Sequence, residues 1–145
     1  MSVPDDAVEV RARGWRTLAA LHARIEQGLE RVLQAEAGLS VVEHAVLCTL
    51  ERQDGWHMRM QQLARAAALS PSATTRLVTR LEDRGLLVRV LCADDRRGIY
   101  TELTPAGRAL VEAARPAYED ALEAELAAAG ELDELAPLVD AIQRG

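Results

Sequence analysis

The fold is decided by residues 63–107, which read LARAAALSPSATTRLVTRLEDRGLLVRVLCADDRRGIYTELTPAG. In the first half of this stretch apolar residues recur at steps of three and four, which is typical of helices with one buried face. In the second half two apolar runs flank a charged turn, which is typical of a β-hairpin. Ser70 and Pro71 mark the start of the second helix, because serine caps a first turn and proline needs no N–H donor there. We expect helices over residues 60–67 and 71–84 and strands over residues 86–91 and 99–103.

Longer helices are predicted on both sides of this stretch. Apolar residues recur at three- and four-residue steps over residues 8–35, and a capping box at residues 40–43 starts a further helix. After the hairpin a long helix is expected over residues 104–130, with a bend at Pro116. A last helix is expected over residues 133–143. The chain is therefore predicted to be mainly α-helical with one small β-hairpin.

Positive charge is concentrated in the same part of an acidic chain. Residues 52–97 contain nine arginines and five acidic residues, a net charge of +4, whereas the rest carries −10 and the whole chain −6. All basic residues are arginines, which more simply reflects genome composition, so the distribution of charge carries the inference. Nucleic acid binding responds to a local basic surface and not to the average charge. The helices and hairpin of residues 63–107 are therefore predicted to bind double-stranded DNA.

The second short helix has a polar face that suits base recognition. This face is predicted to carry Ser72, Thr75, Arg76, Thr79 and Arg80, with Ser70 at the helix start. A helix in the major groove brings such hydroxyl and guanidinium groups to the base edges. At the hairpin tip Arg96 and Arg97 are placed to enter a minor groove, while Asp95 holds the loop. A solvated helix face or turn would look similar taken singly, but helix, helix and hairpin in this order favour DNA binding.

The remaining composition argues against several other classes of protein. No stretch approaches the roughly 18–20 consecutive apolar residues that span a bilayer, and the acidic start is unlike a signal peptide. We therefore expect a cytoplasmic protein without membrane contact. Cys48 and Cys92 form no metal-type pair, and no structural disulfide is expected. No catalytic Ser/His/Asp, Cys/His or paired-carboxylate set falls on adjacent elements, so we expect no enzyme activity, cofactor or metal.

These motifs resemble those of the MarR family of bacterial transcriptional regulators. The segments that carry the resemblance are residues 63–70, 75–87, 95–98 and 103–107, and the likeness extends from about residue 8 to the end of the chain. It implies a single module over residues 1–145. Within it, residues 40–103 would form a winged helix–turn–helix, and residues 7–36 and 104–145 would form dimerisation helices.

The resemblance also implies a function. A homodimer would bind a palindromic operator, usually as a repressor, and a small-molecule effector or an oxidant would relieve the binding. Two long helices with apolar stripes need a partner to cover them, which agrees with self-association, and two-fold symmetry would place the half-sites roughly 10 base pairs apart. By the same likeness the major groove would be met by Ser72, Thr75, Arg76 and Arg80. The minor groove would be met by Arg97 with Arg96 beside it, and Asp95 would orient the wing arginine.

Effectors in this family often bind between the dimer helices and the winged domain. The candidates here are the aromatic or polar exceptions on the first two helices, namely Trp15, His22, His44 and Cys48. Each also has a simpler interpretation. His22 would be a hydrogen-bonded histidine in an interface, Trp15 would only pack against other apolar side chains, and Cys48 would be a small buried apolar side chain. Glu43 and His44 are similar to a metal-ligand pair of zinc-responsive relatives, yet no histidine follows His57. We therefore reject a zinc sensor.

Two other functions stay open. Cys92 is expected near Arg89, Arg96 and Arg97, and nearby positive charge lowers the pKa of a thiol and makes it reactive. A redox-responsive regulator would use this cysteine, although peroxide-sensing relatives use one near the start of the first helix, where this chain has none. Alternatively, the winged module binds a protein partner, which the acidic flanks and the modest local charge leave open.

Overall fold

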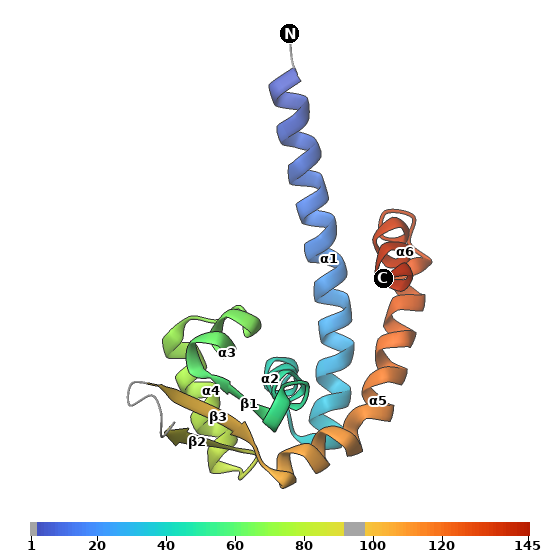
Figure 1. The fold of residues 1–145 in the computed structure, drawn as a ribbon. Helices are drawn as coiled ribbons and strands as arrows, with labels where there is room; N and C mark the ends of the chain where they lie inside the picture. Colours follow the sequence, from blue (N-terminus) through green and yellow to red (C-terminus); the bar gives the residue numbers. More distant parts are fainter. Residues whose placement is uncertain (1–2, 92–97) are drawn as a thin grey trace. The chain divides into compact units, whose positions relative to one another are not determined.

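The structure of the chain is a computed structural model that describes residues 3–91 and 98–145, with side chains from residue 6 onward. It is mainly helical, with a small antiparallel sheet (Figure 1). The elements in chain order are α1 Val3–Ala37, α2 Val41–Glu51, a 3-10 turn Asp54–Trp56, β1 His57–Arg59, α3 Met60–Ala67, α4 Pro71–Asp83, β2 Leu87–Leu91, β3 Ile99–Leu103, α5 Pro105–Gly130 and α6 Ala136–Arg144. No helix in this described part of the chain combines the length and apolarity needed to cross a membrane.

The chain forms two compact units. Leu33–Pro116 is one unit, called here the sheet-bearing unit, and Met1–Val32 with Ala117–Gly145 is the other, called the terminal-helix unit. α1 and α5 each contribute residues to both units. Pro116 lies inside α5, where the two units join, and the bend expected there stays a prediction.

The sheet-bearing unit has a leucine-rich core between its helices and its sheet. The fully buried leucines of its core are Leu39, Leu47, Leu50, Leu63, Leu81, Leu87 and Leu103. The capping box that starts α2 is confirmed, because Ser40 Oγ accepts the Glu43 N–H at 3.0 Å and Glu43 Oε1 accepts the Ser40 N–H at 2.9 Å. This cap fixes the start of α2, and the apolar side chains that follow are directed into the core.

The three strands form one antiparallel sheet in the order β1-β3-β2. β2 and β3 are the predicted hairpin, with Leu87 opposite Leu103, and this prediction is confirmed. β1 adds to the other edge of β3, with Arg59 opposite Tyr100. β1 was not predicted from the sequence, because a strand of three residues is too short to show alternation. The hairpin is thus part of a three-stranded sheet whose edge strands, in the part of the chain that the structure describes, are β1 and β2.

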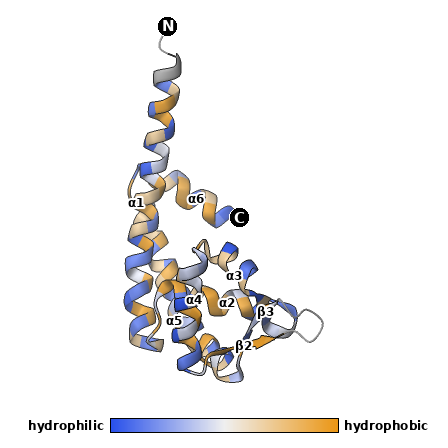
Figure 2. Cartoon of the chain, turned by 90° about the vertical axis from the view of Figure 1, so that its left-hand side faces the viewer, coloured by the Kyte–Doolittle hydropathy of each residue, from blue (hydrophilic) through white to orange (hydrophobic). Residues whose placement is uncertain are grey.

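The terminal-helix unit has a smaller core and an exposed apolar face. Its core consists of Leu21, Leu126, Ala129, Leu135 and Val139. Val8, Trp15 and Leu18 lie along one side of α1 by their spacing of seven and three residues, yet they are 57%, 68% and 47% exposed. Figure 2 shows hydrophobic residues along this part of α1. The apolar stripe predicted for α1 is therefore buried only in part by the chain itself.

Two helix boundaries differ from the prediction. α1 begins at Val3 and not near residue 8, because a proline and acidic residues suit the first turn of a helix, where N–H groups have no partner and negative charge is favourable. The last helix begins at Ala136 and not near residue 133. Residues 131–135 form turns instead, in which Leu135 N–H donates to the Leu132 carbonyl at 2.9 Å.

α5 begins in direct contact with the segment that precedes the hairpin. Thr104 Oγ1 donates to the Gly85 carbonyl at 2.6 Å and accepts the Gly107 N–H at 3.0 Å, which confirms the predicted helix start. Gly107 is buried, and a Cβ atom there would overlap the Leu86 carbonyl oxygen and lie 2.8 Å from Leu103 Cδ1. Glycine is therefore required for this close approach.

We predict that Gly107→Ala lowers the free energy of unfolding by about 1–3 kcal/mol, because overpacking outweighs the higher helix propensity of alanine. Gly14→Ala in α1 is the matched control, since nothing lies within 4 Å of a Cβ at that position. The control should raise the free energy of unfolding by up to about 1 kcal/mol. Urea denaturation followed by circular dichroism measures both, and equal effects would contradict the close approach.

Candidate nucleic-acid interface

α3 and α4 are joined by a tight turn. α3 is followed by Ala68 in the left-handed conformation, with φ 54° and ψ 42°, which reverses the chain within a few residues. Ser70 then caps α4: its hydroxyl accepts the Ala73 N–H at 3.2 Å, and Pro71 occupies the first helical position. The helix start predicted at these two residues is confirmed.

α4 separates a buried face from a polar face. Its buried side chains are Thr74, Leu77, Val78 and Leu81. The side chains predicted to form the polar face are all exposed, namely Ser72, Thr75, Arg76, Thr79 and Arg80. Because the opposite face is packed in the core, this polar face has a fixed direction. The contact of these residues with DNA stays a prediction.

The threonines of this face have their hydroxyl hydrogens engaged. Thr75 Oγ1 donates to the Pro71 carbonyl at 3.0 Å, and Thr79 Oγ1 donates to the Thr75 carbonyl at 2.9 Å. A hydroxyl has one hydrogen, so these side chains present an acceptor oxygen and a methyl group to a ligand. The strong donors of the face are therefore the guanidinium groups of Arg76 and Arg80.

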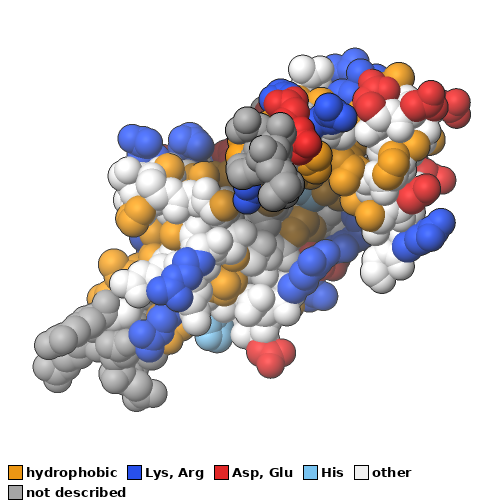
Figure 3. Space-filling view, turned by 90° about the horizontal axis from the view of Figure 1, so that it is seen from above, with side chains coloured by type: hydrophobic (Ala, Val, Ile, Leu, Met, Phe, Trp, Pro, Cys, Tyr) orange, Lys and Arg blue, Asp and Glu red, His pale blue; other side chains and the backbone are white. Residues whose placement is uncertain are grey.

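Basic side chains also lie on the edge strand β1. Arg59 Nε donates to the Tyr100 hydroxyl at 3.0 Å, and the His57 ring meets the same tyrosine edge-on at 5.4 Å between centroids. Figure 3 shows basic side chains on the surface of this unit. Four residues with predicted roles at the hairpin tip, Cys92, Asp95, Arg96 and Arg97, lie outside the described residues, so their roles stay predictions.

Arginine contacts connect α4 to the helices that precede it. Arg80 Nε lies 3.9 Å from Glu43 Oε2 of α2. Arg84, directly after α4, donates to the carbonyl oxygens of Ala37 and Gly38 at 2.9 and 2.8 Å. Those two carbonyls belong to the end of α1, where a helix leaves its oxygens without partners. This contact was not predicted from the sequence, because its partners are 46 and 47 residues apart.

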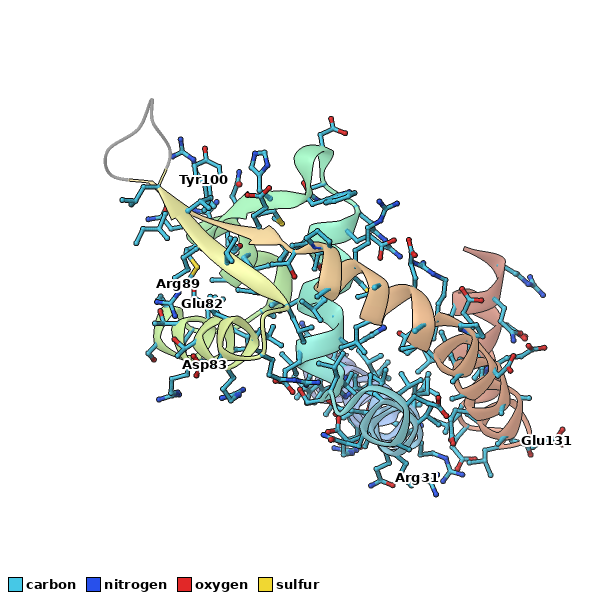
Figure 4. The ribbon with its side chains drawn as sticks, turned by 90° about the horizontal axis from the view of Figure 1, so that it is seen from below. Arg31, Glu82, Asp83, Arg89, Tyr100 and Glu131 are labelled. Atoms are coloured by element: carbon cyan, nitrogen blue, oxygen red, sulfur yellow. The ribbon has the colours of Figure 1, made fainter. Side chains whose placement is uncertain are left out.

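Arg89 connects β2 to α4. Its Nη2 donates to Thr79 Oγ1 and lies 3.7 Å from Glu82 Oε1. Glu82 Oε2 also accepts the backbone N–H of Arg89 at 3.0 Å. Figure 4 shows Arg89 and Glu82 beside each other between the strand and the helix. Arg89 was not placed at the interface with α4 from the sequence, although an arginine inside an apolar strand was a signal for a specific contact.

Of the four predicted effector-binding residues, His44 and Cys48 lie together on α2. Cys48 Sγ is 3.4 Å from His44 Nε2, in the unit where Glu51 Oε1 and Arg115 Nη2 form an ion pair of 2.7 Å. Burial, and next the positive charge of Arg115, lower the pKa of His44, so this ring is neutral at neutral pH. Burial, and next the Glu51 carboxylate, raise the pKa of the Cys48 thiol, which disfavours the reactive thiolate.

The other two candidates lie on α1 in the terminal-helix unit. Trp15 is 68% exposed, and His22 is exposed with its Nδ1 3.6 Å from Glu26 Oε2. The four residues are thus divided between the two units, and their common role stays a prediction. Over residues 3–91 and 98–145 no group of three His, Cys, Asp or Glu side chains is placed to hold a metal ion.

Known proteins share this sequence pattern and this fold. A family model described as MarR family matches residues 37–98. A MarR family transcriptional regulator from Streptomyces coelicolor, solved in complex with DNA, is similar with a TM-score of 0.76 at 28% identity, over 90% of this chain and 81% of that one. The chain belongs to the MarR family. Within this MarR chain α2, α3, α4 and the hairpin form a winged helix–turn–helix, which confirms the predicted fold class.

Two further similar proteins agree with membership of the MarR family. The HTH-type transcriptional regulator PecS from Dickeya dadantii is 31% identical over 96 residues, which are 66% of this chain and 57% of PecS. The chain thus matches little more than half of that relative. BpsR from Bordetella bronchiseptica, whose DNA binding is regulated by 6-hydroxynicotinic acid, is similar with a TM-score of 0.70 at 26% identity, over 88% of each chain.

We predict that His44 makes the stability of this MarR protein depend on pH. Its pKa in the folded chain lies below the ordinary value of 6.5, so the unfolded chain takes up a proton first as the pH falls. The contribution of the neutral ring is therefore present above about pH 6.5 and is lost as the pH falls toward the folded-state pKa. Urea denaturation between about pH 8 and about pH 5, which spans the range in which histidine titrates, should show a smaller loss for His44→Gln than for the wild type. Parallel profiles would contradict the prediction.

Proposed function

We propose that the protein is a sequence-specific, DNA-binding transcriptional regulator that acts as a homodimer on a palindromic operator. The observation that carries this proposal is the exposed face of α4, which presents hydroxyl and guanidinium groups on a capped helix beside a hairpin. The major groove, about 12 Å wide, accommodates such a helix. The DNA complex of the similar protein from Streptomyces coelicolor supports the same role.

The chemistry of this face indicates which bases it reads. Arg76 and Arg80 suit bidentate donation to guanine, whereas Thr75 and Thr79 suit the thymine methyl group or the amino groups of adenine and cytosine. Arg80 is available for a base contact, because its side chain is 60% exposed and its Nε lies 3.9 Å from Glu43 Oε2, at the outer limit of an ion pair. Ser70 and Ser72 complete the polar face at the start of the helix.

At the hairpin tip we assign Arg96 and Arg97 to the minor groove and Asp95 to the orientation of the wing arginine. This assignment rests on the family resemblance and on the sequence order Asp-Arg-Arg-Gly. Arginine inserted into a minor groove responds to groove width more than to base identity. These residues should therefore add affinity, while α4 supplies most of the discrimination between sequences.

Self-association would cover the apolar face of α1. Val8, Trp15 and Leu18 are too exposed to be explained by packing within the chain, and a patch of this kind marks an interaction site. Residues 7–36 and 104–145 are the dimerisation helices of this proposal. Two-fold symmetry would then present two copies of α4 to half-sites roughly 10 base pairs apart.

A small-molecule effector is proposed to relieve repression. The support is the contact of His44 with Cys48 on α2, because binding sites for small molecules place a few polar groups in mainly apolar surroundings. Trp15 and His22 are the candidates from the terminal-helix unit. The regulation of BpsR by 6-hydroxynicotinic acid is a precedent among similar proteins. A repressor of this type acts in the cytoplasm, where the operator is accessible.

We predict that the wild-type protein binds the DNA upstream of its own gene more tightly than a scrambled duplex, and that binding weakens steeply with salt as counterions return to the phosphates. Arg76→Ala should remove about 1–3 kcal/mol of discrimination between the two duplexes, whereas Arg97→Ala should weaken both alike. Arg52→Ala is the matched control, because Arg52 is exposed just after α2. Fluorescence anisotropy at two salt concentrations measures all four proteins.

Absence of DNA binding at low salt would contradict the proposal and favour a winged-helix module that binds protein. Equal weak binding to both duplexes would place the operator elsewhere in the genome. Loss of binding after mild oxidation, prevented by Cys92→Ser, would support the redox alternative to a small-molecule effector.

We predict that Trp15→Glu converts the dimer to a monomer at micromolar concentration, because it places a charge in the proposed apolar interface. Ala20→Glu is the matched control, since Ala20 is an exposed position of the same helix that points about 140° away from Trp15 at 100° per residue. Light scattering after size-exclusion chromatography should give twice the chain mass for the wild type and for the control. A Trp15→Glu dimer would show that the interface lies elsewhere.

A further inference from the structure

Arg89 lies at the junction between α4 and the β2–β3 hairpin. Its side chain is 32% exposed, and its Nη2 reaches Thr79 on the polar face of α4. Its Nε is buried and has no hydrogen-bond partner among the described residues. The buried Nε cannot meet a ligand from outside, but the side chain is partly exposed and its bond with Thr79 lies at the surface. A cation placed in this way at the edge of a polar helix face is suited to an external anion.

The geometry of double-stranded DNA indicates which anion that is. The proposed function, on which this inference rests, places α4 in a major groove and the hairpin in the adjacent minor groove. Two adjacent grooves are separated by one sugar-phosphate backbone. That backbone must cross the junction between α4 and the hairpin, where Arg89 lies. We propose that Arg89 binds a phosphate of this backbone and thereby fixes the position of α4 along the groove.

Glu82 is the positioning residue of this contact. One of its carboxylate oxygens accepts the backbone N–H of Arg89 at 3.0 Å, and the other lies 3.7 Å from the guanidinium. Both the strand and the side chain are thus held before DNA arrives, which reduces the conformational entropy lost on binding. Because Glu82 belongs to α4, it also makes the position of Arg89 follow that of the helix.

Thr79 is the partner of Arg89 in the absence of DNA. Its hydroxyl hydrogen is used within the helix, and its oxygen accepts from Arg89. A phosphate oxygen carries charge and forms a stronger hydrogen bond with a guanidinium than a neutral hydroxyl does. The Arg89 contact therefore exchanges Thr79 for phosphate on binding. This gives Thr79 a role through Arg89 that was not predicted from the sequence.

The test uses a fluorescent duplex of arbitrary sequence, because a phosphate contact acts on any DNA. Anisotropy titrations over a salt series give the slope of log affinity against log salt, which changes by about 0.9 for each phosphate contact. Arg89→Gln should lower this slope by about one and weaken binding about tenfold at low salt. Arg89→Lys keeps the charge and should keep the slope.

Arg52→Gln is the control with the same change in net charge. Arg52 follows α2 nine residues after Glu43, the α2 residue that pairs with α4, and so lies about 13 Å along the helix axis from that contact. The slope of log affinity against log salt for Arg52→Gln should equal that of the wild type. Thermal unfolding followed by circular dichroism checks that each variant folds. If Arg89→Gln is unfolded, Arg89→Met, which keeps the aliphatic stem, makes the same test.

The outcomes separate this inference from the proposed function. Wild-type binding with an unchanged slope in Arg89→Gln would overturn the phosphate contact alone, even if the affinity falls, because a purely structural role alters affinity without altering the number of neutralised phosphates. Failure of the wild type to bind the duplex at low salt would overturn the proposed function and this inference with it. A slope lowered in Arg89→Gln but not in Arg89→Lys or Arg52→Gln supports it.

Discussion

The packing of α4 against the leucine core sets the direction of every polar group on its other side. Leu77, Val78 and Leu81 keep at most 3% of their surface exposed, and burial of each such side chain contributes about 1.5–3 kcal/mol. A helix of 13 residues is only marginally stable on its own. Its position therefore comes from tertiary packing. The hydroxyl and guanidinium groups of the opposite face gain their orientation from the same packing.

Acidic residues beside this face hold its arginines in place. Glu43 lies next to Arg80, and Glu82 lies next to Arg89. Because these pairs are partly exposed, water and salt screen them, and each contributes little to stability. A phosphate or a base can therefore replace a carboxylate as the partner of either arginine. The local excess of arginine would attract DNA, and the carboxylates hold the arginine side chains in their observed positions.

Local patterns predicted the elements of the fold, whereas contacts between distant residues were found only in the structure. Ser40 and Ser70 were predicted as helix caps because a cap and its partner lie within three residues. The exposed face of α4 was predicted from helical periodicity. β1 was not predicted because it is only three residues long. The contacts of Arg84 and Arg89 were not predicted because tertiary packing, and not spacing in the sequence, brings their partners close. The contact of His44 with Cys48 could have been predicted from the sequence, since residues four apart share one side of a helix.

The two hydrogen bonds from Arg84 join the end of α1 to the end of α4 within the sheet-bearing unit. A planar guanidinium that donates to two successive carbonyls tolerates little rotation, and Gly38, with φ 63°, ends α1 directly at this joint. The final turn of α1 and the residue that follows α4 consequently move as one body. This joint ties the last residues of α1, which belong to the sheet-bearing unit, to the base of α4, so a rotation of those residues would turn α4 with them.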